Sequence, residues 1–410
     1  MELVNNKYQI QGVNLIDVAN EFGTPVYVYD SERIKAQYEK LKGAFPKLDV
    51  KIKYASKALT NLAVLKYLRS LGAGLDAVSI QEVELGLMAG FNPKDIMYTP
   101  NGVSFDEIKE GIEKGVMINI DNISVLEQFG NEFRDTVPVF IRLNPHLMAG
   151  GNHKISTGHI DSKFGISILQ TRHLLRVIET YNIKVVGLHM HTGSDILDAG
   201  VFLNGAKLLF DLAKDFKELR FIDFGSGFKV PYHESDVQVD LEDLGEKISK
   251  AFRAFCKDYG RDLQLWFEPG KYLVSEAGVL LVKTNVVKTT PATVFVGVDS
   301  GMNHLIRPMM YDAYHDIVNI SNINGTKRVY TIVGYICETD TFGWDRKLDE
   351  VKEGDILAIK NAGAYGFSMS SNYNSRFRPA EVLIYNGKPH LIRKRETMED
   401  ITRNQVDIEL

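Results

Sequence analysis

Short runs rich in β-branched and aromatic residues alternate with segments of helical periodicity between about Ser31 and Phe267. This alternation is typical of parallel strands that are joined by right-handed helical crossovers. We expect strand cores at Val50–Tyr54, Gly74–Val78, Ile96–Thr99, Met117–Ile120, Val137–Leu143, Val185–His189, Phe221–Phe224 and Leu263–Phe267. These eight strands predict an α/β fold of the TIM-like (β/α)8 barrel class, with a doubly wound open sheet as the alternative.

Residues suited to catalysis or to ligand binding fall near or just past the C-terminal ends of several predicted strands. They are Lys57, Asp76, Asn101, Arg142, His191, Gly225 and Glu268. In a (β/α)8 barrel, the C-terminal ends of all strands meet at one rim, and this rim carries the active site. The barrel interpretation therefore predicts that these residues lie at the same end of the barrel.

The character of the sequence changes after Gly270, where β-rich runs are separated by turn residues. The runs are Val279–Val287, Thr293–Val298, Val329–Val333, Ile356–Ile359 and Val382–Tyr385. They predict an all-β C-terminal domain. The apolar runs Tyr8–Ile10 and Val26–Tyr29 precede the barrel, which needs no extra leading strand. We therefore expect residues 1–30 to join the β domain of residues 271–410, and residues 31–270 to form the barrel.

Composition and charge exclude several classes of function. The formal net charge of −5 and the isoelectric point near 6.1 provide no broad attraction for nucleic acid or for an anionic membrane. Cys256 and Cys337 are too few for a disulfide framework, and no apolar run approaches the ~20 residues of a membrane span. The first residues lack the features of a secretory signal. We expect a cytoplasmic globular protein with a small-molecule substrate.

Lys57 closes the first strand run and precedes an amphipathic helical segment. A lysine at the mouth of a barrel can form a Schiff base with a carbonyl compound. Most lysines at strand ends are simply solvated, so Lys57 indicates a Schiff base only in combination with the other motifs.

Gly225 and Gly227 follow the seventh predicted strand, where barrels usually bind phosphate. Glycine lets the backbone approach a ligand closely, and the exposed amides of such a loop can bind an anion. An ordinary turn is the alternative interpretation of two nearby glycines. We expect the backbone N–H of the intervening Ser226 to be available to a phosphate.

Glu268 ends the last predicted strand, and Pro269 then fixes the direction in which the chain leaves the barrel. A carboxylate in this place can keep a pyridine nitrogen protonated, and the protonated ring then withdraws electrons from a reacting carbon. A structural ion pair with a lysine or arginine is the alternative.

His189 and His191 are two residues apart on an extended segment and therefore share a face, as two metal ligands could. A barrel metallohydrolase is thus the rival enzyme class. Such an enzyme would need further ligands at other strand ends, and neither the first nor the last strand offers a histidine. We expect no metal site, and we interpret His189 as a core residue.

Two polar clusters interrupt the β-rich half, one around Arg307 and the other around Glu338. An arginine can bind a carboxylate through two hydrogen bonds, and a glutamate can bind an ammonium group, so the pair suits the head group of an amino acid. An intramolecular ion pair between Arg307 and Glu338 is equally compatible with these residues. Cys256, on the apolar side of a predicted helix, is interpreted as core.

Several motifs occur in one order along the chain: Lys53–Ala58, His189–Ser194, Phe224–Phe228, Glu268–Lys271, Cys337–Asp340 and Gly363–Gly366. In combination they resemble the pyridoxal-phosphate-dependent decarboxylases of the alanine-racemase-like fold. The stretch Lys154–Gly158 and the Cys-Glu-Thr-Asp motif are most similar to the diaminopimelate decarboxylase family. This resemblance covers nearly the whole chain and implies the conversion of meso-2,6-diaminopimelate to L-lysine and carbon dioxide. A decarboxylase of another basic amino acid or of carboxynorspermidine is the alternative.

The resemblance also implies a role for each matching residue. Lys57 would bind pyridoxal 5'-phosphate covalently and Cys337 would supply a proton. The cofactor would further contact His191, Ser194, Gly225, Gly227, Glu268, Pro269, Gly270, Lys271 and Tyr365. The substrate would contact Lys271, Arg307, Tyr311, Glu338 and Tyr365. The family forms homodimers in which the Cys-Glu segment comes from the second subunit.

Two features of the sequence bear on how the substrate is held. Lys271 stands where the family usually has an arginine, so a point charge replaces a two-pronged donor. The polar stretch Met148–Phe164 is too long for an ordinary strand-to-helix connection, and we expect it to cover the mouth of the barrel as a lid.

Overall fold

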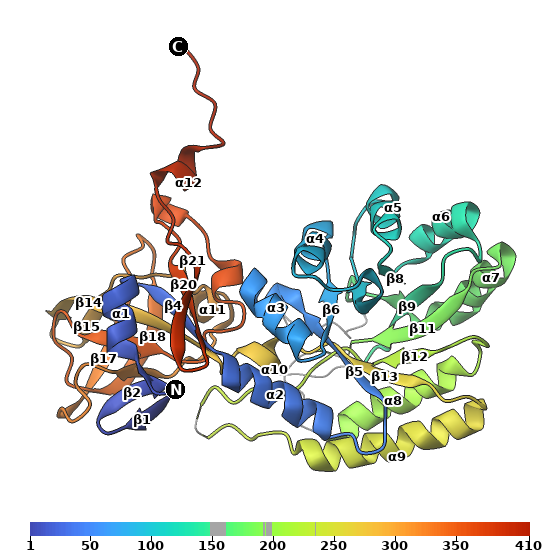
Figure 1. The fold of residues 1–410 in the computed structure, drawn as a ribbon, viewed down its shortest axis with the longest axis horizontal. Coiled ribbons are helices and arrows are strands. Elements are labelled where there is room, and N and C mark those ends of the chain that lie inside the picture. The colour runs from blue at the N-terminus through green and yellow to red at the C-terminus, as the bar shows by residue number, and fades with distance from the viewer. Residues whose placement is uncertain (148–160, 192, 194–198, 234) are drawn as a thin grey trace. The chain divides into compact units, whose positions relative to one another are not determined.

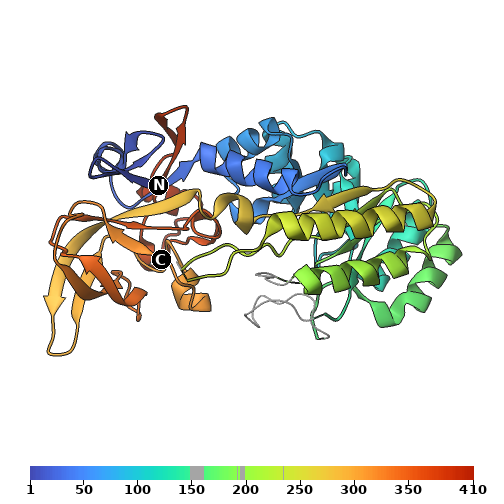
Figure 2. The same ribbon diagram turned by 90° about the horizontal axis from the view of Figure 1, so that it is seen from below.

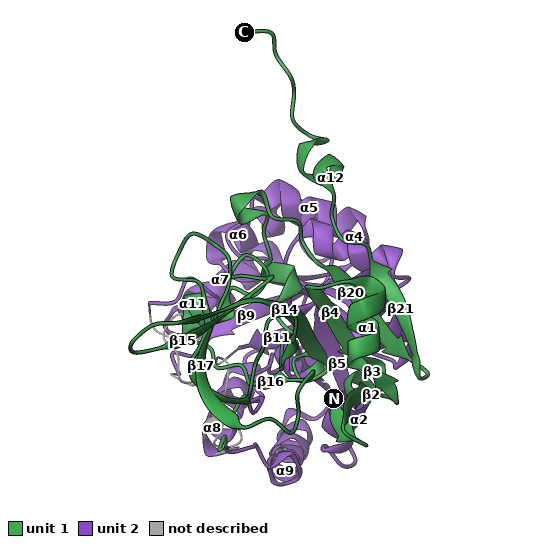
Figure 3. Cartoon of the chain, turned by 90° about the vertical axis from the view of Figure 1, so that its left-hand side faces the viewer, with its two compact units in different colours: residues 1–35, 232–236, 273–410 green, residues 36–231, 237–272 purple. Residues whose placement is uncertain are grey.

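The computed structural model describes residues 1–147, 161–191, 193, 199–233 and 235–410. Two compact units can be distinguished, which Figure 3 shows in different colours. The barrel unit comprises residues 36–231 and 237–272. The sheet unit comprises residues 1–35, 232–236 and 273–410, so it includes a short segment that interrupts the barrel sequence.

Eight parallel strands close into a ring in the barrel unit (Figures 1 and 2). In their spatial order they are β5 (Val50–Ala55), β6 (Gly74–Ala77), β7 (Ile96–Tyr98), β8 (Met117–Ile120), β9 (Val139–Asn144), β11 (Val185–Met190), β12 (Phe221–Asp223) and β13 (Gln264–Phe267). Pairing of β8 with β9 and of β13 with β5 completes the circle. The predicted barrel is therefore confirmed and the open sheet is excluded. A short strand β10 (Ile166–Ser167) adds to β9.

Helices surround this ring. They are α2 (Ser31–Gly43), α3 (Leu62–Ser70), α4 (Ile80–Met88), α5 (Phe105–Glu113), α6 (Ile123–Phe133), α7 (Thr171–Tyr181), α8 (Ala199–Ala213) and α9 (Leu241–Tyr259). Several begin where a polar side chain accepts a hydrogen bond from a free backbone N–H of the first turn, as Ser79 does for α4 and Asp240 for α9. Gly260 ends α9 in the left-handed conformation that a glycine adopts without steric cost.

Aromatic side chains fill one layer of the barrel interior. Phe140, Phe221 and Trp266 lie against one another with ring centroids 4.2–5.5 Å apart. A side chain at Gly187 would collide with the ring of Phe140, so this strand position has room only for glycine. The barrel is thus packed inside, and chemistry is restricted to its rim.

The sheet unit is built around one long strand, β14 (Gly278–Thr289). It pairs with β4 (Val26–Asp30), β15 (Val294–Val298) and β19 (Ile356–Ile359). The sheet continues through β16 (Ile317–Asn319), β17 (Lys327–Val333), β18 (Thr341–Asp349), β20 (Ala380–Tyr385) and β21 (Lys388–Arg393). Because β4 lies between β14 and β20, the N-terminal segment joins the β domain, as the sequence predicts.

Smaller elements complete the sheet unit. Strands β1 (Glu2–Val4), β2 (Lys7–Ile10) and β3 (Val13–Asn14) form a separate sheet, and α1 (Leu15–Phe22) follows. Its buried residues pack with β4, β14 and β20 in one apolar core. The remaining helices of the unit are α10 (Lys271–Val274, whose first two residues belong to the barrel unit), α11 (Arg307–Tyr311) and α12 (Met398–Thr402). Within the described ranges, none of the helices combines the length and apolarity needed to cross a bilayer.

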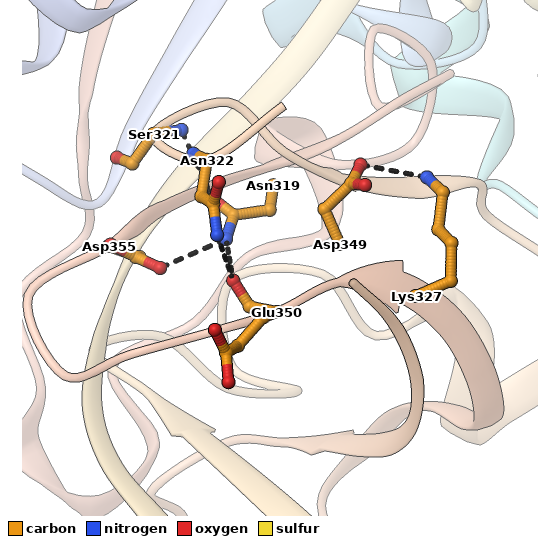
Figure 4. Close-up of polar contacts among 7 residues, drawn as sticks. All are labelled: Asn319, Ser321, Asn322, Lys327, Asp349, Glu350 and Asp355. Carbon is orange, nitrogen blue, oxygen red and sulfur yellow. Dashed lines mark hydrogen bonds and ion pairs between the residues drawn. The ribbon is translucent and has the colours of Figure 1, made fainter. Parts of the chain in front are cut away.

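A buried asparagine organises the turns at one edge of this unit (Figure 4). The Asn319 side chain is 2% exposed, and its amide nitrogen donates to the Glu350 carbonyl at 3.0 Å and to Asp355 at 2.9 Å. Its oxygen accepts from the backbone N–H groups of Ser321 and Asn322. One side chain therefore holds three separate segments together.

Candidate active site

Lys57 lies in a single 3-10 turn, Ser56–Ala58, directly after β5. The buried Ser56 hydroxyl has two acceptors for its one proton, the Asp76 backbone carbonyl at 3.1 Å and Glu82 Oε2 at 2.9 Å. The same Glu82 oxygen accepts from the Val78 N–H at 2.9 Å. The turn that carries Lys57 is therefore attached to the end of the neighbouring strand β6.

The run Glu268–Gly270 lies beside this turn. The Pro269 carbonyl accepts from the Ala55 N–H at 3.3 Å, and an added Cβ at Gly270 would lie 3.1 Å from Ala58 Cβ. On the other side, the Glu268 N–H donates to the Gly225 carbonyl at 2.6 Å. The structure thus brings the predicted lysine turn, the Glu-Pro-Gly run and the glycine loop together at the rim. Lys271 comes next in the chain, at the start of α10.

A chain of polar contacts ends at the Glu268 carboxylate. Asn119 Nδ2 lies 2.9 Å from His189 Nδ1, and His189 Nε2 lies 3.0 Å from Glu268 Oε2. Because the asparagine amide donates to Nδ1, the proton of the neutral ring is on Nε2 and faces Glu268. Burial opposes the charge of Glu268, but the contact with His189 Nε2 and then the positive charge of Arg142 outweigh it and lower the pKa of Glu268.

Two neighbouring carboxyl groups behave in the opposite way. Burial, and next the negative charge of Glu268, raise the pKa values of Asp76 and Asp223 well above their ordinary range. Of these three carboxyl groups, Glu268 is therefore the one that carries the negative charge. The positive charge that acts on it belongs to the buried Arg142, whose guanidinium lies 4.8 Å from the centre of the Phe164 ring.

The glycine loop differs in one respect from the sequence-based prediction. Gly225 and Gly227 both have positive φ angles, 62° and 143°, which supports the need for glycine. The Gly225 N–H donates to Asp223 Oδ1 at 2.8 Å, and the Ser226 N–H donates to His191 Nδ1 at 3.1 Å. The Ser226 amide is thus engaged by His191 and not available, because the loop folds back on the histidine.

His191 contacts the glycine loop at close range. A Cβ added to Gly225 would lie 2.6 Å from His191 Nδ1, so a larger residue there would displace the ring. Burial, followed by the positive charge of Arg142, lowers the pKa of His191 well below its ordinary value. A neutral imidazole of this kind can stack against an aromatic ligand without carrying charge into the site.

These residues fit pyridoxal 5'-phosphate. In the described part of the chain, the buried Glu268 Oε1 has no hydrogen-bond donor, which suits a protonated pyridine nitrogen. The positive-φ glycine loop suits close approach of a phosphate, and Lys57 is the nearby amine. Glu268 with His189 and Asp223 also offers three ligand atoms within 4.8 Å of one another, so this cluster has the spacing of a metal site as well.

In the sheet unit, Arg307 is buried and begins α11, and Tyr311 ends the same helix. Arg307 Nη1 donates to the Tyr232 hydroxyl at 2.6 Å, and the guanidinium lies 4.9 Å from the centre of that ring. The Tyr232 hydroxyl also contacts Ser275 Oγ at 2.7 Å. A residue of the segment 232–236 thus orients the predicted carboxylate-binding arginine.

Cys337 and Glu338 lie on an exposed turn that Asp340 fixes. The Asp340 carboxylate accepts from the Met302 N–H at 2.7 Å and from the Ile336 N–H at 3.0 Å. Tyr373 donates to Glu338 Oε1 at 2.8 Å. Arg307 and Glu338 therefore have different partners, which argues against the ion pair that the sequence left open.

Tyr365 has a φ of 57°, an unfavourable conformation for a residue with a large side chain. It lies in the turn Gly363–Gly366, where an added Cβ at Gly366 would lie 2.5 Å from the Ala362 carbonyl oxygen. Only a residue without a side chain fits at Gly366, so this glycine permits the turn that contains Tyr365. Ser194 and residues 148–160 of the expected lid lie outside the described residues, so their predicted roles stay predictions.

Sequence reasoning did not assign several residues of the rim. His189, interpreted as core, is buried but contacts Glu268, while Asn119, Glu82 and Asp223 were given no role. Asp223 ends β12, and Asn119 and His189 are the penultimate residues of β8 and β11. Glu82 lies in the first turn of α4 and accepts a hydrogen bond from the Val78 N–H in the turn before this helix. Strand-end position was the signal that could have found His189 and Asp223.

Comparison with known proteins places this site in a family. Residues 31–275 match the family described as pyridoxal-dependent decarboxylase, pyridoxal binding domain. The diaminopimelate decarboxylase of Methanothermobacter thermautotrophicus is 40% identical over 406 residues, which cover 97% of this chain and 95% of that protein. The crystal structure of the enzyme of that name from Methanocaldococcus jannaschii has a TM-score of 0.92 at 35% identity and covers 99% of this chain and 98% of that one.

Another solved structure is the diaminopimelate decarboxylase of Helicobacter pylori in complex with L-lysine, with a TM-score of 0.87 at 33% identity over 95% of this chain and 98% of that one. The barrel, the attached sheet and the rim residues define a pyridoxal-dependent decarboxylase. Within this class, the chain belongs to the diaminopimelate decarboxylase family. A lysine/ornithine decarboxylase from Vibrio vulnificus, at 22% identity and a TM-score of 0.80, shares the fold.

Proposed function

We propose that this chain removes carbon dioxide from meso-2,6-diaminopimelate and releases L-lysine. The observation that carries the proposal is the position of the buried Glu268, whose carboxylate contacts His189 at 3.0 Å in the run that lies beside the turn of Lys57. A permanent carboxylate there stabilises a protonated pyridine nitrogen, as a decarboxylase of this class requires. The identity of up to 40% with diaminopimelate decarboxylases supports the choice of substrate.

When bound, pyridoxal 5'-phosphate supplies an electron sink for the electrons that remain when carbon dioxide departs. The residues that would hold it are Lys57 at the aldehyde, Glu268 at the ring nitrogen and His191 at the ring face. The Gly225–Gly227 loop, Ser194 and Tyr365 would bind the phosphate, with Pro269, Gly270 and Lys271 nearby.

The chain's own residues would then manage the substrate and the proton. Arg307 and Lys271 bind carboxylate, and Glu338 binds the distal ammonium group, with Tyr311 and Tyr365 beside them. The thiol of Cys337 donates a proton to the α-carbon after carbon dioxide has left, so that the negative charge there is neutralised. Glu268 would accept a hydrogen bond from the protonated ring nitrogen and so would keep that nitrogen protonated.

We also propose a homodimer in which Cys337 and Glu338 of one chain complete the site that contains Lys57 of its partner. The exposure of both side chains on a firmly held turn supports this arrangement. Both cysteines are free, which agrees with our proposal that the enzyme works in the reducing cytoplasm.

The test is product identification with the purified protein and pyridoxal phosphate. Incubation with meso-diaminopimelate should yield L-lysine and carbon dioxide in equal amounts, whereas L-lysine, L-ornithine and L-arginine should not be decarboxylated. Lys271 is the residue that makes this comparison necessary, since a lysine replaces the usual arginine. Decarboxylation of ornithine or arginine in preference to diaminopimelate would overturn the substrate assignment. A colourless, zinc-containing protein would instead favour the metal cluster.

A further inference from the structure

A short turn next to the Cys337 segment contacts both functional side chains of that segment. We propose that this turn, Tyr373–Ser375, positions them: Asn374 orients the Cys337 thiol, and Tyr373 orients the Glu338 carboxylate. The inference rests on the proposed function, in which Cys337 donates a proton and Glu338 binds an ammonium group. Asn374 and Tyr373 would act through these residues and are therefore positioning residues.

The amide of Asn374 suits a thiol that gives up and regains a proton. Asn374 Nδ2 lies 3.3 Å from Cys337 Sγ, and Asn374 Oδ1 lies 3.5 Å from the same sulfur. The amide oxygen can accept from the S–H group, and the amide nitrogen can donate to the thiolate. One side chain therefore holds the sulfur in place both before and after the proton is transferred.

The phenol of Tyr373 suits a carboxylate that must stay charged and in place. Its hydroxyl donates to Glu338 Oε1 at 2.8 Å. This hydrogen bond, followed by the charge of Glu338, raises the pKa of Tyr373 to about 12, so the phenol stays protonated at neutral pH. Because Tyr373 binds one carboxylate oxygen, the other oxygen can accept a hydrogen bond from an ammonium group.

The turn itself is held in an unfavourable backbone conformation. Asn374 and Ser375 have φ angles of 58° and 54°, in the left-handed region that most residues avoid. Asn372 stabilises the turn by donating to the Arg376 carbonyl at 3.0 Å. Asparagine tolerates this region better than most residues, so Asn374 combines a required backbone shape with a side chain that reaches Cys337.

The segment that carries Cys337 and Glu338, on the other side of these contacts, is also held in place. Asp340 binds the Met302 and Ile336 amides, and a side chain at Gly301 or Gly334 would collide with that carboxylate. Two rigid backbone segments thus face each other. All four contacting side chains are exposed, so their mutual hydrogen bonds contribute little to folding and are free to serve positioning.

The test compares Asn374→Gly, Asn374→Asp and Tyr373→Phe in the holoenzyme. Glycine suits the positive φ and removes only the amide, and aspartate keeps the shape but adds a negative charge. We measure the rate at which iodoacetamide alkylates Cys337 at a fixed pH, with the buried Cys256 as an internal reference. We also measure kcat and KM for meso-diaminopimelate and the midpoint of thermal unfolding.

Asn374→Gly should slow alkylation about fivefold, because the thiolate loses a donor, and should lower kcat about tenfold with little change in KM. Asn374→Asp should slow alkylation further, because its charge opposes the thiolate. Tyr373→Phe should raise KM about tenfold and leave alkylation unchanged. The exposed Tyr385 of the same unit is the matched control, and Tyr385→Phe should change none of these quantities.

Equal alkylation rates and equal kcat in wild type and both Asn374 variants would overturn the role of Asn374. An unchanged KM in Tyr373→Phe would overturn that of Tyr373. If the wild-type protein does not decarboxylate diaminopimelate, the proposed function fails, whereas the alkylation rates still report whether Asn374 controls the thiol. The two failures can therefore be distinguished.

Discussion

Glu268 shows how one buried charge is maintained among groups that would otherwise be neutral. Burial by itself raises the pKa of a carboxyl group, as it does for Asp76 and Asp223. Glu268 differs because His189 lies 3.0 Å away and Arg142 is close enough to act on it. At the scale of the residue, the identity of the neighbours decides which carboxylate is ionised.

Replacing Glu268 with glutamine tests this charge. Glu268→Gln keeps the size and removes the charge, so we expect kcat to fall by a factor of about 100 or more while the cofactor stays bound. Steady-state kinetics and the absorbance of the bound cofactor measure the two effects. Glu276→Gln, which alters a partly exposed ion pair with Arg33, is the control and should retain activity. Normal kcat in Glu268→Gln would rule out an electrostatic role.

Tyr232 provides a second prediction at this scale, because its hydroxyl holds Arg307 at 2.6 Å. Tyr232→Phe keeps the ring under the guanidinium but removes the hydrogen bond, so we expect KM to rise five- to tenfold, which corresponds to about 1 kcal/mol. In an Arg307→Lys background the same substitution should have a much smaller effect. Equal effects in both backgrounds would show that Tyr232 does not act through Arg307.

At the scale of elements, the sheet unit depends on side chains that join its turns. The conformations of the segments at Asn319, Glu350 and Asp355 are fixed by one buried amide, which Figure 4 shows between them. The amide nitrogen of Asn319 donates two hydrogen bonds and its oxygen accepts two. Removing this side chain therefore leaves several buried groups without partners.

We therefore predict that Asn319→Ala lowers the free energy of unfolding by about 2–4 kcal/mol. Urea unfolding followed by circular dichroism measures the change. Lys327→Ala is the matched control from the same region, since the Lys327–Asp349 ion pair leaves the lysine side chain 54% exposed and should contribute less than about 1 kcal/mol. A loss at Asn319 no larger than that at Lys327 would contradict this account.

At the scale of the whole molecule, the proposed sharing of active sites can be tested with two inactive variants. Lys57→Ala and Cys337→Ala should each abolish activity, but their hybrid dimer contains one site with both residues intact. Mixing equal amounts with subunit exchange should restore about a quarter of the wild-type activity. Native mass spectrometry follows the exchange. If hybrids form and the mixture remains inactive, each site belongs to one chain.

Two buried histidines of the sheet unit should make stability depend on pH. Burial lowers the pKa of His304 to about 4 and that of His315 to about 3. Below the ordinary histidine pKa of about 6.5, His304 and His315 are protonated in the unfolded chain but stay neutral in the folded chain. The free energy of unfolding therefore falls as pH decreases from 6.5 toward 4.

The expected loss is about 2 kcal/mol for each histidine at pH 5. Urea unfolding at pH 7 and pH 5 measures it. His315→Asn retains a donor for the Lys360 carbonyl, which His315 Nδ1 contacts at 2.8 Å, and should reduce the difference between the two pH values. An undiminished difference in this variant would show that other groups cause the acid sensitivity.

Much of the fold could be predicted because periodicity is a local property. Each strand of the barrel was located from its own apolar residues. Because Lys57 and Glu268 follow the ends of two of these strands, the barrel places both at one rim. The attachment of the N-terminal segment was also predictable, although its place between β14 and β20 was not. Strands β16, β18 and β21 were missed, since short or partly exposed strands have weak apolar patterns.

The sequence by itself determined the eight-stranded barrel, the β-rich character of the second unit and the residue types that decarboxylation needs. Only the tertiary structure decided which carboxylate is charged, that His191 engages the Ser226 amide, and that Tyr232 holds Arg307. The physical reason is that periodicity records whether each residue is buried, whereas a pKa or a hydrogen bond depends on groups that are distant in the sequence and adjacent only after folding.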